Sequence, residues 1–301
     1  SALLPQIVKP KALQVANSIG MTLRSMTTLI GPLLAALLLG LELMDLSAEN
    51  QKSQKLNLVL VFFLDGMSFA FSAFLLKFIP IPNLERHPGQ SIKRNILSGL
   101  RYFWSLKELR LLVIYIALVS SFLGGMMQVG IPVLVKYQWQ EGAEVFGLLM
   151  SSLAMGNIVG MAIAAKSTLA HRLSLGQSIL LADLIVGLLL IMLARVTEYW
   201  HGILILVSMG SLAGFVLVVF ISWVQQQASR EMLGRLMSIV MFGLVGLMPL
   251  GTVIAGLTLQ FLTIEFFFLA SGTLLLLVAI LAMAFSEIPR VRAATVPLQS
   301  N

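Results

Sequence analysis

The sequence contains no cysteine, and few of its residues carry a charge. The absence of cysteine excludes a disulfide framework and a metal site built from thiolates. Asp, Glu, Lys and Arg make up only 11% of the residues, whereas a soluble domain contains about 25%. A chain with so little charge cannot cover a water-facing surface, which excludes a large soluble domain and a disordered chain.

Apolar residues make up 58% of the 301 residues, and the mean hydropathy is +0.95. This composition is typical of an integral membrane protein. Because a membrane-spanning helix takes about 20 residues, the composition provides for about eight spans and their connections.

Stretches without Asp, Glu, Lys or Arg mark the spans, because such a side chain at the bilayer centre costs about 2.5 to 3.5 kcal/mol. Three further apolar stretches hold an embedded charge: 15–44 with Arg24, 57–79 with Asp65, and 177–194 with Asp183. Five stretches are unbroken, at residues 111–135, 145–165, 199–229, 236–264 and 266–286. The predicted fold class is an all-α polytopic membrane protein with eight transmembrane helices.

The basic residues are concentrated in the N-terminal segment, in alternate connections and in the tail. Cytoplasmic loops carry an excess of Lys and Arg, so both termini of the chain are predicted to be cytoplasmic. The net charge of +7 is then a signal of topology. It gives no reason to predict a nucleic-acid partner.

The one long connection contains a predicted amphipathic helix. Ile92, Ile96, Leu100 and Phe103 fall on one helical face, and several Lys and Arg residues fall elsewhere. This pattern predicts a cytoplasmic helix that lies against the anionic headgroups of the lipid bilayer. A solvated linker helix is the alternative. The predicted organisation is a two-span segment at 1–80, the linker at 81–108, a six-span segment at 109–286 and a cytoplasmic tail at 287–301.

Secondary transporters are often built from six-helix halves joined by a cytoplasmic loop. A two-span segment before the loop therefore predicts that four helices are missing upstream. The sequence opens SALLPQIVKPKALQVAN, without an initiator Met or a signal peptide. We accordingly expect the sequence to start within a longer protein.

Several motifs on these spans resemble the major facilitator superfamily. The opening Ala2-Leu3-Leu4-Pro5-Gln6-Ile7-Val8 resembles the entry into that family's fifth helix, and Gly31-Pro32 resembles its fifth-helix antiporter motif. Small residues stand at the motif's glycine positions: Ser18, Thr27, Ala35 and Ala36. The likeness is to the bacterial drug and siderophore exporters, which include macrolide-efflux and enterobactin-exporter-like proteins.

Later motifs follow in the order that the resemblance implies. Residues 99–102, Gly-Leu-Arg-Tyr, are similar to the family's middle-loop pattern, and residues 234–238, with Pro249 and Gly251, resemble the entry into its eleventh helix. His171-Arg172 stands where the family has an Asp-Arg signature. The resemblance implies that the eight spans are helices five to twelve of a major facilitator fold.

Embedded carboxyl groups are the candidates for proton coupling. Asp65 lies about 13 Å into its span, where a carboxyl group is uncharged unless it is paired. Such a group can take up a proton and release it again, as an antiporter requires. The alternative is a buried Asp that only packs against a neighbouring helix. Asp183 is a second candidate, although the resemblance places both on peripheral helices. Arg24 is predicted to reach the headgroups, to pair with Asp65 or to contact an anionic substrate.

The spans that resemble helices seven and ten supply the candidates for the substrate path. The second of these spans carries Ser222, Trp223 and Gln225 near its cytoplasmic end. Polar and methionine residues on the first are Tyr115, Ser120, Ser121, Met126, Met127 and Gln128. Methionine and aromatic side chains suit a site that adapts to bulky apolar ligands. Packing is the alternative for each methionine.

Small residues recur at spacings that allow helices to approach closely. Gly156 and Gly160 form one such face, and Gly210 and Gly214 form another. The stretch with Gly243, Gly246, Pro249, Gly251 and Gly256 predicts close packing and a proline kink in the seventh span.

Enzymatic alternatives lack their motifs. An intramembrane aspartyl protease also needs two membrane-embedded Asp residues, but Leu64 and Ala182 precede them here. The three histidines lie far apart, no HExxH motif occurs, and no phosphate-binding loop is present. A non-transporting membrane scaffold remains an alternative.

The sequence therefore predicts a secondary active transporter and not an enzyme. Its expected activity is the proton-coupled export of drugs or other amphipathic small molecules by alternating access. The expected partners are the small-molecule substrate, protons and the bilayer, with no cofactor or metal. We expect a monomer in the bacterial inner membrane.

Overall fold

The computed structural model describes residues 63, 66–75, 92–166, 174–227 and 232–291. The chain divides into two compact units, one of residues 1–24 and 38–89 and the other of residues 25–37 and 90–301. In the first unit the structure describes an apolar helical segment, Gly66–Leu75. The predicted span 15–44 lies outside the described residues, and so does most of 57–79.

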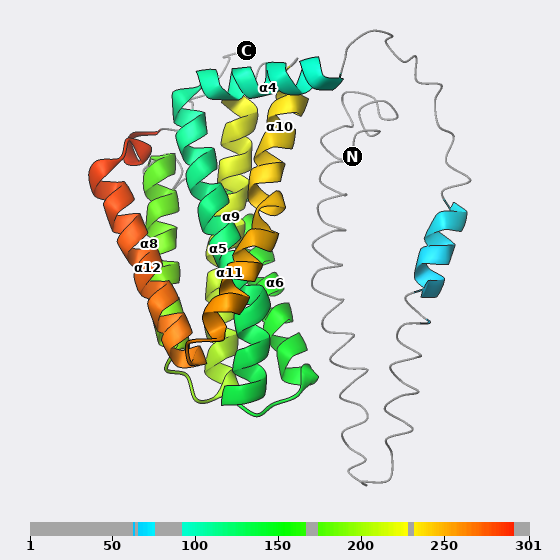
Figure 1. The fold of residues 1–301 in the computed structure, drawn as a ribbon, viewed down its shortest axis with the longest axis vertical. Helices are drawn as coiled ribbons and strands as arrows, with labels where there is room; N and C mark the ends of the chain where they lie inside the picture. The colour runs from blue at the N-terminus through cyan, green and yellow to red at the C-terminus, as the bar shows by residue number, and fades with distance from the viewer. Residues whose placement is uncertain (1–62, 64–65, 76–91, 167–173, 228–231, 292–301) are drawn as a thin grey trace. The chain divides into compact units, whose positions relative to one another are not determined.

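Six helical spans in the described part of the second unit are long and apolar enough to cross a membrane. Figure 1 shows them side by side in one bundle. They are α5 (Lys107–Val133, continued by the π-helix Leu134–Gln138), α6 (Ala143–Lys166), α8 (Leu175–Leu193), α9 (Tyr199–Gln227), a composite span of α10 (Leu233–Met241), the π-helix η3 (Phe242–Gly246) and α11 (Met248–Leu259), and α12 (Ile264–Phe285). These spans match the six predicted from residue 109 onward to within a few residues. A multi-pass helical membrane protein is confirmed, whereas the count of eight is not.

Two of the helices begin at side chains that cap them. Ser174 precedes α8, and its hydroxyl accepts a hydrogen bond from the Gln177 N–H at 3.1 Å while the Gln177 side chain accepts one from the Ser174 N–H. Thr263 precedes α12, and its hydroxyl accepts from the Phe266 N–H at 3.4 Å. These hydroxyls satisfy N–H groups that would otherwise have no partner at the start of each helix.

The spans are joined in three couples by glycines at helix crossings. A Cβ atom added at any of these glycines would overlap the backbone of the facing helix. The glycines are Gly156, Gly160, Gly210 and Gly214 between α6 and α9, Gly125 and Gly251 between α5 and α11, and Gly272 of α12 against Gly187 of α8. The close packing predicted for the first four is confirmed.

The composite span differs from the expected kinked helix. The chain forms the π-helix η3 immediately before the turn that carries Pro249, so the span consists of two α-helical parts. Of the glycines predicted to pack closely, Gly251 meets a neighbouring backbone. Gly256 has no atom within 4 Å of an added Cβ, so its small size serves no contact in the described structure.

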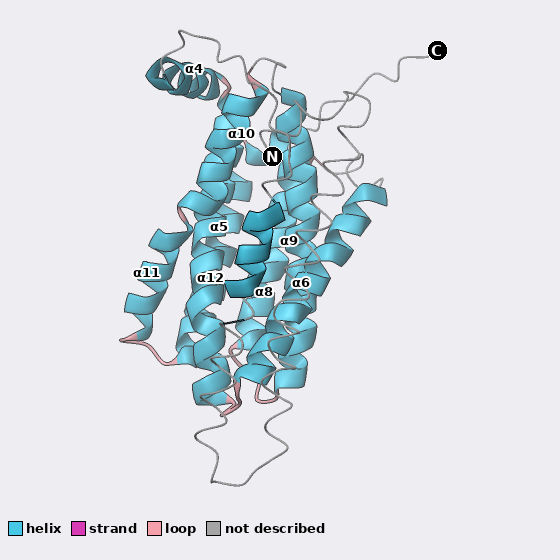
Figure 2. Ribbon diagram, turned by 90° about the vertical axis from the view of Figure 1, so that its right-hand side faces the viewer, coloured by secondary structure: helices cyan, strands magenta, loops and turns pink. Residues whose placement is uncertain are grey.

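The helix α4 (Ile92–Ser105) lies across one end of the bundle, which we call the α4 end (Figures 1 and 2). The structure has a helix where one is predicted, and the two members of its predicted apolar face whose side chains are described differ in burial. Phe103 is only 5% exposed and packs into the bundle, whereas Leu100 is 40% exposed. The helix rests on α10 through Gly99, where an added Cβ would lie 3.0 Å from the Cβ of Arg235. Because of this contact, Leu100 lies on a side of α4 that the bundle does not cover.

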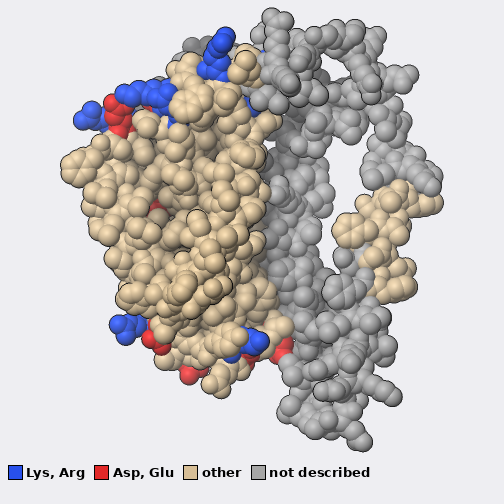
Figure 3. All heavy atoms as spheres, viewed as in Figure 1, with Lys and Arg blue, Asp and Glu red and all other residues tan. Residues whose placement is uncertain are grey.

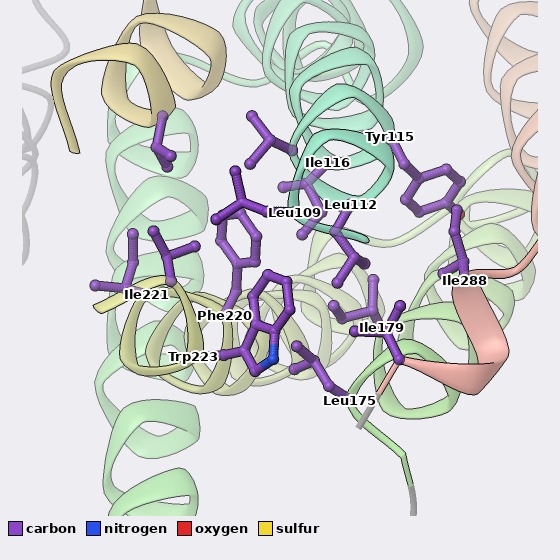
Figure 4. Packing of buried hydrophobic residues seen from close by; sticks show 14 of the residues in the cluster. Leu109, Leu112, Tyr115, Ile116, Leu175, Ile179, Phe220, Ile221, Trp223 and Ile288 are labelled. Carbon is purple, nitrogen blue, oxygen red and sulfur yellow. The ribbon is translucent and has the colours of Figure 1, made fainter. Parts of the chain in front are cut away.

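Buried apolar side chains form two clusters along the bundle. Figure 4 shows the cluster nearer the α4 end, in which α5, α8 and α9 meet around Leu112, Ile179 and Phe220. The second cluster lies toward the opposite end and includes Ile131, Leu190 and Phe268. Figure 3 shows that Lys, Arg, Asp and Glu gather at the two ends of the bundle and leave a broad band almost without charge between them, as a membrane span requires.

An exposed ion pair joins the first and last spans at the α4 end. The ammonium of Lys107 lies 2.7 Å from Glu287 Oε2 and donates a hydrogen bond to Glu287 Oε1 at 2.8 Å. This hydrogen bond and the positive charge of Lys107 lower the pKa of Glu287 below its ordinary value of 4.5.

A lowered pKa means that the pair contributes stability above the ordinary pKa and loses it as the pH falls through the pKa of the folded state. We expect Glu287→Gln to lower the melting temperature slightly at about pH 7 and not at about pH 3, because exposed pairs contribute little. Thermal unfolding in detergent at both pH values measures this. A difference that persists unchanged in acid would contradict it.

Candidate functional site

A carboxyl group and a phenol meet inside the bundle. The Tyr115 hydroxyl of α5 donates a hydrogen bond to Asp183 Oδ2 of α8 at 2.8 Å. Asp183 is 8% exposed and Tyr115 is 9% exposed. Figure 4 shows Tyr115 on α5 beside the apolar side chains that line this part of the bundle.

The two residues lie at the same depth in their helices. Tyr115 follows the first residue of α5 by eight positions, and Asp183 follows the first residue of α8 by eight positions. At 1.5 Å per residue both lie about 12 Å from the α4 end of their helices. The pair therefore lies within the membrane span, away from the headgroups at either end.

The pair is also isolated from positive charge. Within the described ranges, the one ion pair joins Lys107 to Glu287, and Asp183 has no cationic partner. A buried carboxylate without a cation is costly, so the protonated form is favoured until water or a donor reaches the group. Such a carboxyl group can hold a proton and release it when its surroundings change. It can also act as a polar link between α5 and α8, with no exchange of protons.

The helix α9 carries several exposed polar residues on one side, most of them near its two ends. They recur at helical spacing and are His201, Ser208, Ser222, Gln225 and Gln226, all exposed. We call this set the α9 polar face. Lipid-facing helix surfaces are normally apolar, so polar side chains within a span indicate a surface that meets water or a polar ligand.

The predicted path residues fall in different environments. Gln128 of α5 is exposed, and so are Ser222 and Gln225 of α9. Trp223 is 1% exposed and packs in the cluster with Phe220 and Leu175. In this structure the tryptophan supports the bundle, and the glutamines are the path candidates with accessible side chains.

A shallow apolar pocket of about 190 Å³ lies below α4, between α5 and the composite span. Phe103, Val113, Ala117 and Phe242 are among its lining residues. It lies on a different face of α5 from Tyr115, because residues two positions apart point about 200° apart around a helix. The pocket has no charged group to orient a ligand, so it can accept only the apolar part of one.

Four of the predicted site residues lie outside the described residues. These are Arg24, Gly31, Pro32 and Asp65. Their predicted roles stay predictions. In the part of the chain that the structure describes, no group of three His, Asp or Glu residues is placed to hold a metal ion.

The contact between Tyr115 and Asp183 was not predicted from the sequence. Each residue was recognised separately, one as a path candidate and the other as a proton-coupling candidate. Nothing in the sequence shows that α5 and α8 pack together, because α6 lies between them in the chain.

The family model described as "Transmembrane secretion effector" matches residues 55–300, which include every helix of the bundle. No curated protein matches the chain.

Proposed function

Because the chain belongs to the transmembrane secretion effector family, a transporter family of the major facilitator type, we propose that it exports drugs or other amphipathic small molecules in exchange for protons. Alternating access between two helical halves is the proposed mechanism. The observation that carries the proposal is the buried Asp183 carboxyl group, which has a phenol and no cation as its partner in the described structure.

The proposed proton carriers are Asp183 and Asp65. In one state of the transporter, Asp183 holds a proton among apolar side chains and accepts the Tyr115 hydrogen bond. In another state, water reaches the carboxyl group and the proton leaves. Tyr115 keeps the carboxyl oriented during the exchange, so it is a positioning residue. Asp65 is proposed from the sequence alone.

The proposed substrate path runs along Gln128 and the α9 polar face. Glutamine side chains can both donate and accept hydrogen bonds, which suits the polar part of an amphipathic molecule. The exposed positions of Gln128 and Gln225 support this assignment. We further propose that the bacterial inner membrane holds the protein as a monomer with the α4 end in the cytoplasm. The basic residues Arg101, Lys107, Arg110, Arg235 and Arg290 at that end support this orientation.

Drug accumulation in proteoliposomes tests proton coupling. Vesicles with an acidic interior are given ethidium outside, and uptake is followed by fluorescence with and without nigericin, which collapses the pH gradient. We expect uptake well above that of protein-free vesicles, and we expect nigericin to abolish it. Uptake that continues unchanged after nigericin would remove proton coupling from the proposal.

A further inference from the structure

The helix α4 lies at the level where the membrane meets water. The six spans cross the bilayer, and α4 runs across their end instead of continuing along them (Figure 1). A helix in this position lies parallel to the membrane surface. One side of it is held by the bundle through Gly99 and Phe103, and exposed apolar side chains lie beside that covered side.

An exposed apolar stripe runs along α4 beside the face that the bundle covers. It consists of Leu97, Leu100 and Trp104, which are 59%, 40% and 52% exposed. Their spacing of three and four residues places them on one side of the helix. We call these three residues the α4 flank. Tryptophan is enriched where membrane meets water, because its ring is apolar and its N–H is polar.

Only basic charges accompany the flank on this helix. Residues 92–105 include Lys93, Arg94 and Arg101 and no Asp or Glu. The guanidinium of Arg110 lies 5.1 Å from the centre of the Trp104 ring and donates a hydrogen bond to the Trp104 carbonyl oxygen at 3.1 Å. The nearby acids are Glu108, which is exposed, and Glu287, which Lys107 neutralises. The charge of α4 therefore complements an anionic surface.

We propose that the α4 flank docks on the anionic lipid surface of the membrane. Leu97, Leu100 and Trp104 enter the boundary of the acyl chains, and the basic residues of α4 bind the phosphate-bearing headgroups. This inference concerns lipid recognition and does not depend on what the protein transports or on proton coupling.

The absence of cysteine allows a direct test on the full chain. Leu97→Cys, labelled with bimane, reports on the flank. Ser105→Cys is the matched control, because Ser105 is an exposed residue of α4 about 100° around the helix from the flank. Each labelled protein is reconstituted in phosphatidylcholine vesicles and in vesicles with added phosphatidylglycerol. Quenching by doxyl lipids and by iodide in the water is measured.

We expect doxyl lipids to quench the label at Leu97→Cys more than at Ser105→Cys, and more strongly when phosphatidylglycerol is present. Arg101→Gln is expected to reduce the effect of phosphatidylglycerol, because each basic side chain near an anionic surface changes the docked-to-undocked ratio about fivefold. Leu100→Cys is a second position for the label if Leu97→Cys folds poorly.

Three results would overturn the proposal. Quenching at Leu97→Cys by iodide alone would make α4 a solvated linker helix. Protection from both quenchers would mean that another part of the chain covers the flank. Equal doxyl quenching in the two vesicle compositions would remove the recognition of anionic lipid.

Discussion

Replacement of Gly160 by leucine is expected to prevent α6 and α9 from packing, so that little folded protein is recovered. A Cβ atom at Gly160 would overlap the carbonyl oxygen of Ser211 on α9. A backbone atom cannot rotate away as a side chain can, so the two helices must separate. Overpacking within a core costs about 1–3 kcal/mol, and separating two helices along their contact adds to it. The folded fraction is measured by size-exclusion chromatography in detergent.

Gly256→Leu is the matched control for this substitution. Gly256 also lies in a membrane-spanning helix, but an added Cβ has no atom of the described residues within 4 Å. Leucine is a better helix former than glycine by about 0.8–1 kcal/mol, so this variant should be as stable as the wild type or slightly more stable. The smaller substitutions Gly160→Ala and Gly256→Ala should differ in the same direction, with a lower melting temperature for Gly160→Ala than for Gly256→Ala. Wild-type stability of Gly160→Leu would contradict the close crossing of α6 and α9.

Asp183→Asn is expected to abolish gradient-driven drug accumulation while leaving the protein folded. Asparagine has the shape of aspartate and can still accept the Tyr115 hydrogen bond at its amide oxygen, but it cannot release a proton. Ethidium uptake into acidic vesicles should therefore fall to the level that remains after nigericin. Glu265→Gln is the matched control, because Glu265 is an exposed carboxylate in the first turn of α12, at the opposite end of the bundle.

Tyr115→Phe separates the chemistry of the pair from its packing. The variant keeps the ring and leaves the buried carboxyl without its hydroxyl partner, which should cost about 1–3 kcal/mol of stability. We expect reduced but still gradient-dependent uptake, because the carboxyl group remains. If Asp183→Asn transports like the wild type at a normal melting temperature, the pair is a packing contact and Asp183 is not a proton carrier.

The residues that form the six spans of the bundle could be predicted, because the property that marks a span is local in the sequence. Long uncharged stretches and the cost of charge in lipid mark a span without any knowledge of its neighbours. The α4 helix was predicted from the local periodicity of its apolar residues, but the side of it that the bundle covers was not. Which side of α4 is covered depends on where α10 begins, and the contact of Gly99 with Arg235 joins residues far apart in the sequence.

The candidate site shows the same limit. Asp183 and Tyr115 were both visible as polar residues in apolar spans, yet their hydrogen bond depends on which helices are neighbours. Trp223 illustrates the converse, because its place near Ser222 and Gln225 suggested an accessible side chain. One position along a helix is a rotation of about 100°, which takes Trp223 from the exposed side into the core.

The glycine crossings also have a mechanical consequence for the bundle. Within each of the couples α6 with α9, α5 with α11, and α8 with α12, the backbones lie too close for a side chain to separate them. Between couples, larger side chains fill the space, as Phe220 and Leu112 do in the cluster near the α4 end. Side chains can change rotamer and slide, whereas touching backbones cannot. We therefore expect each couple to move as one unit and any rearrangement of the bundle to take place at the boundaries between the couples.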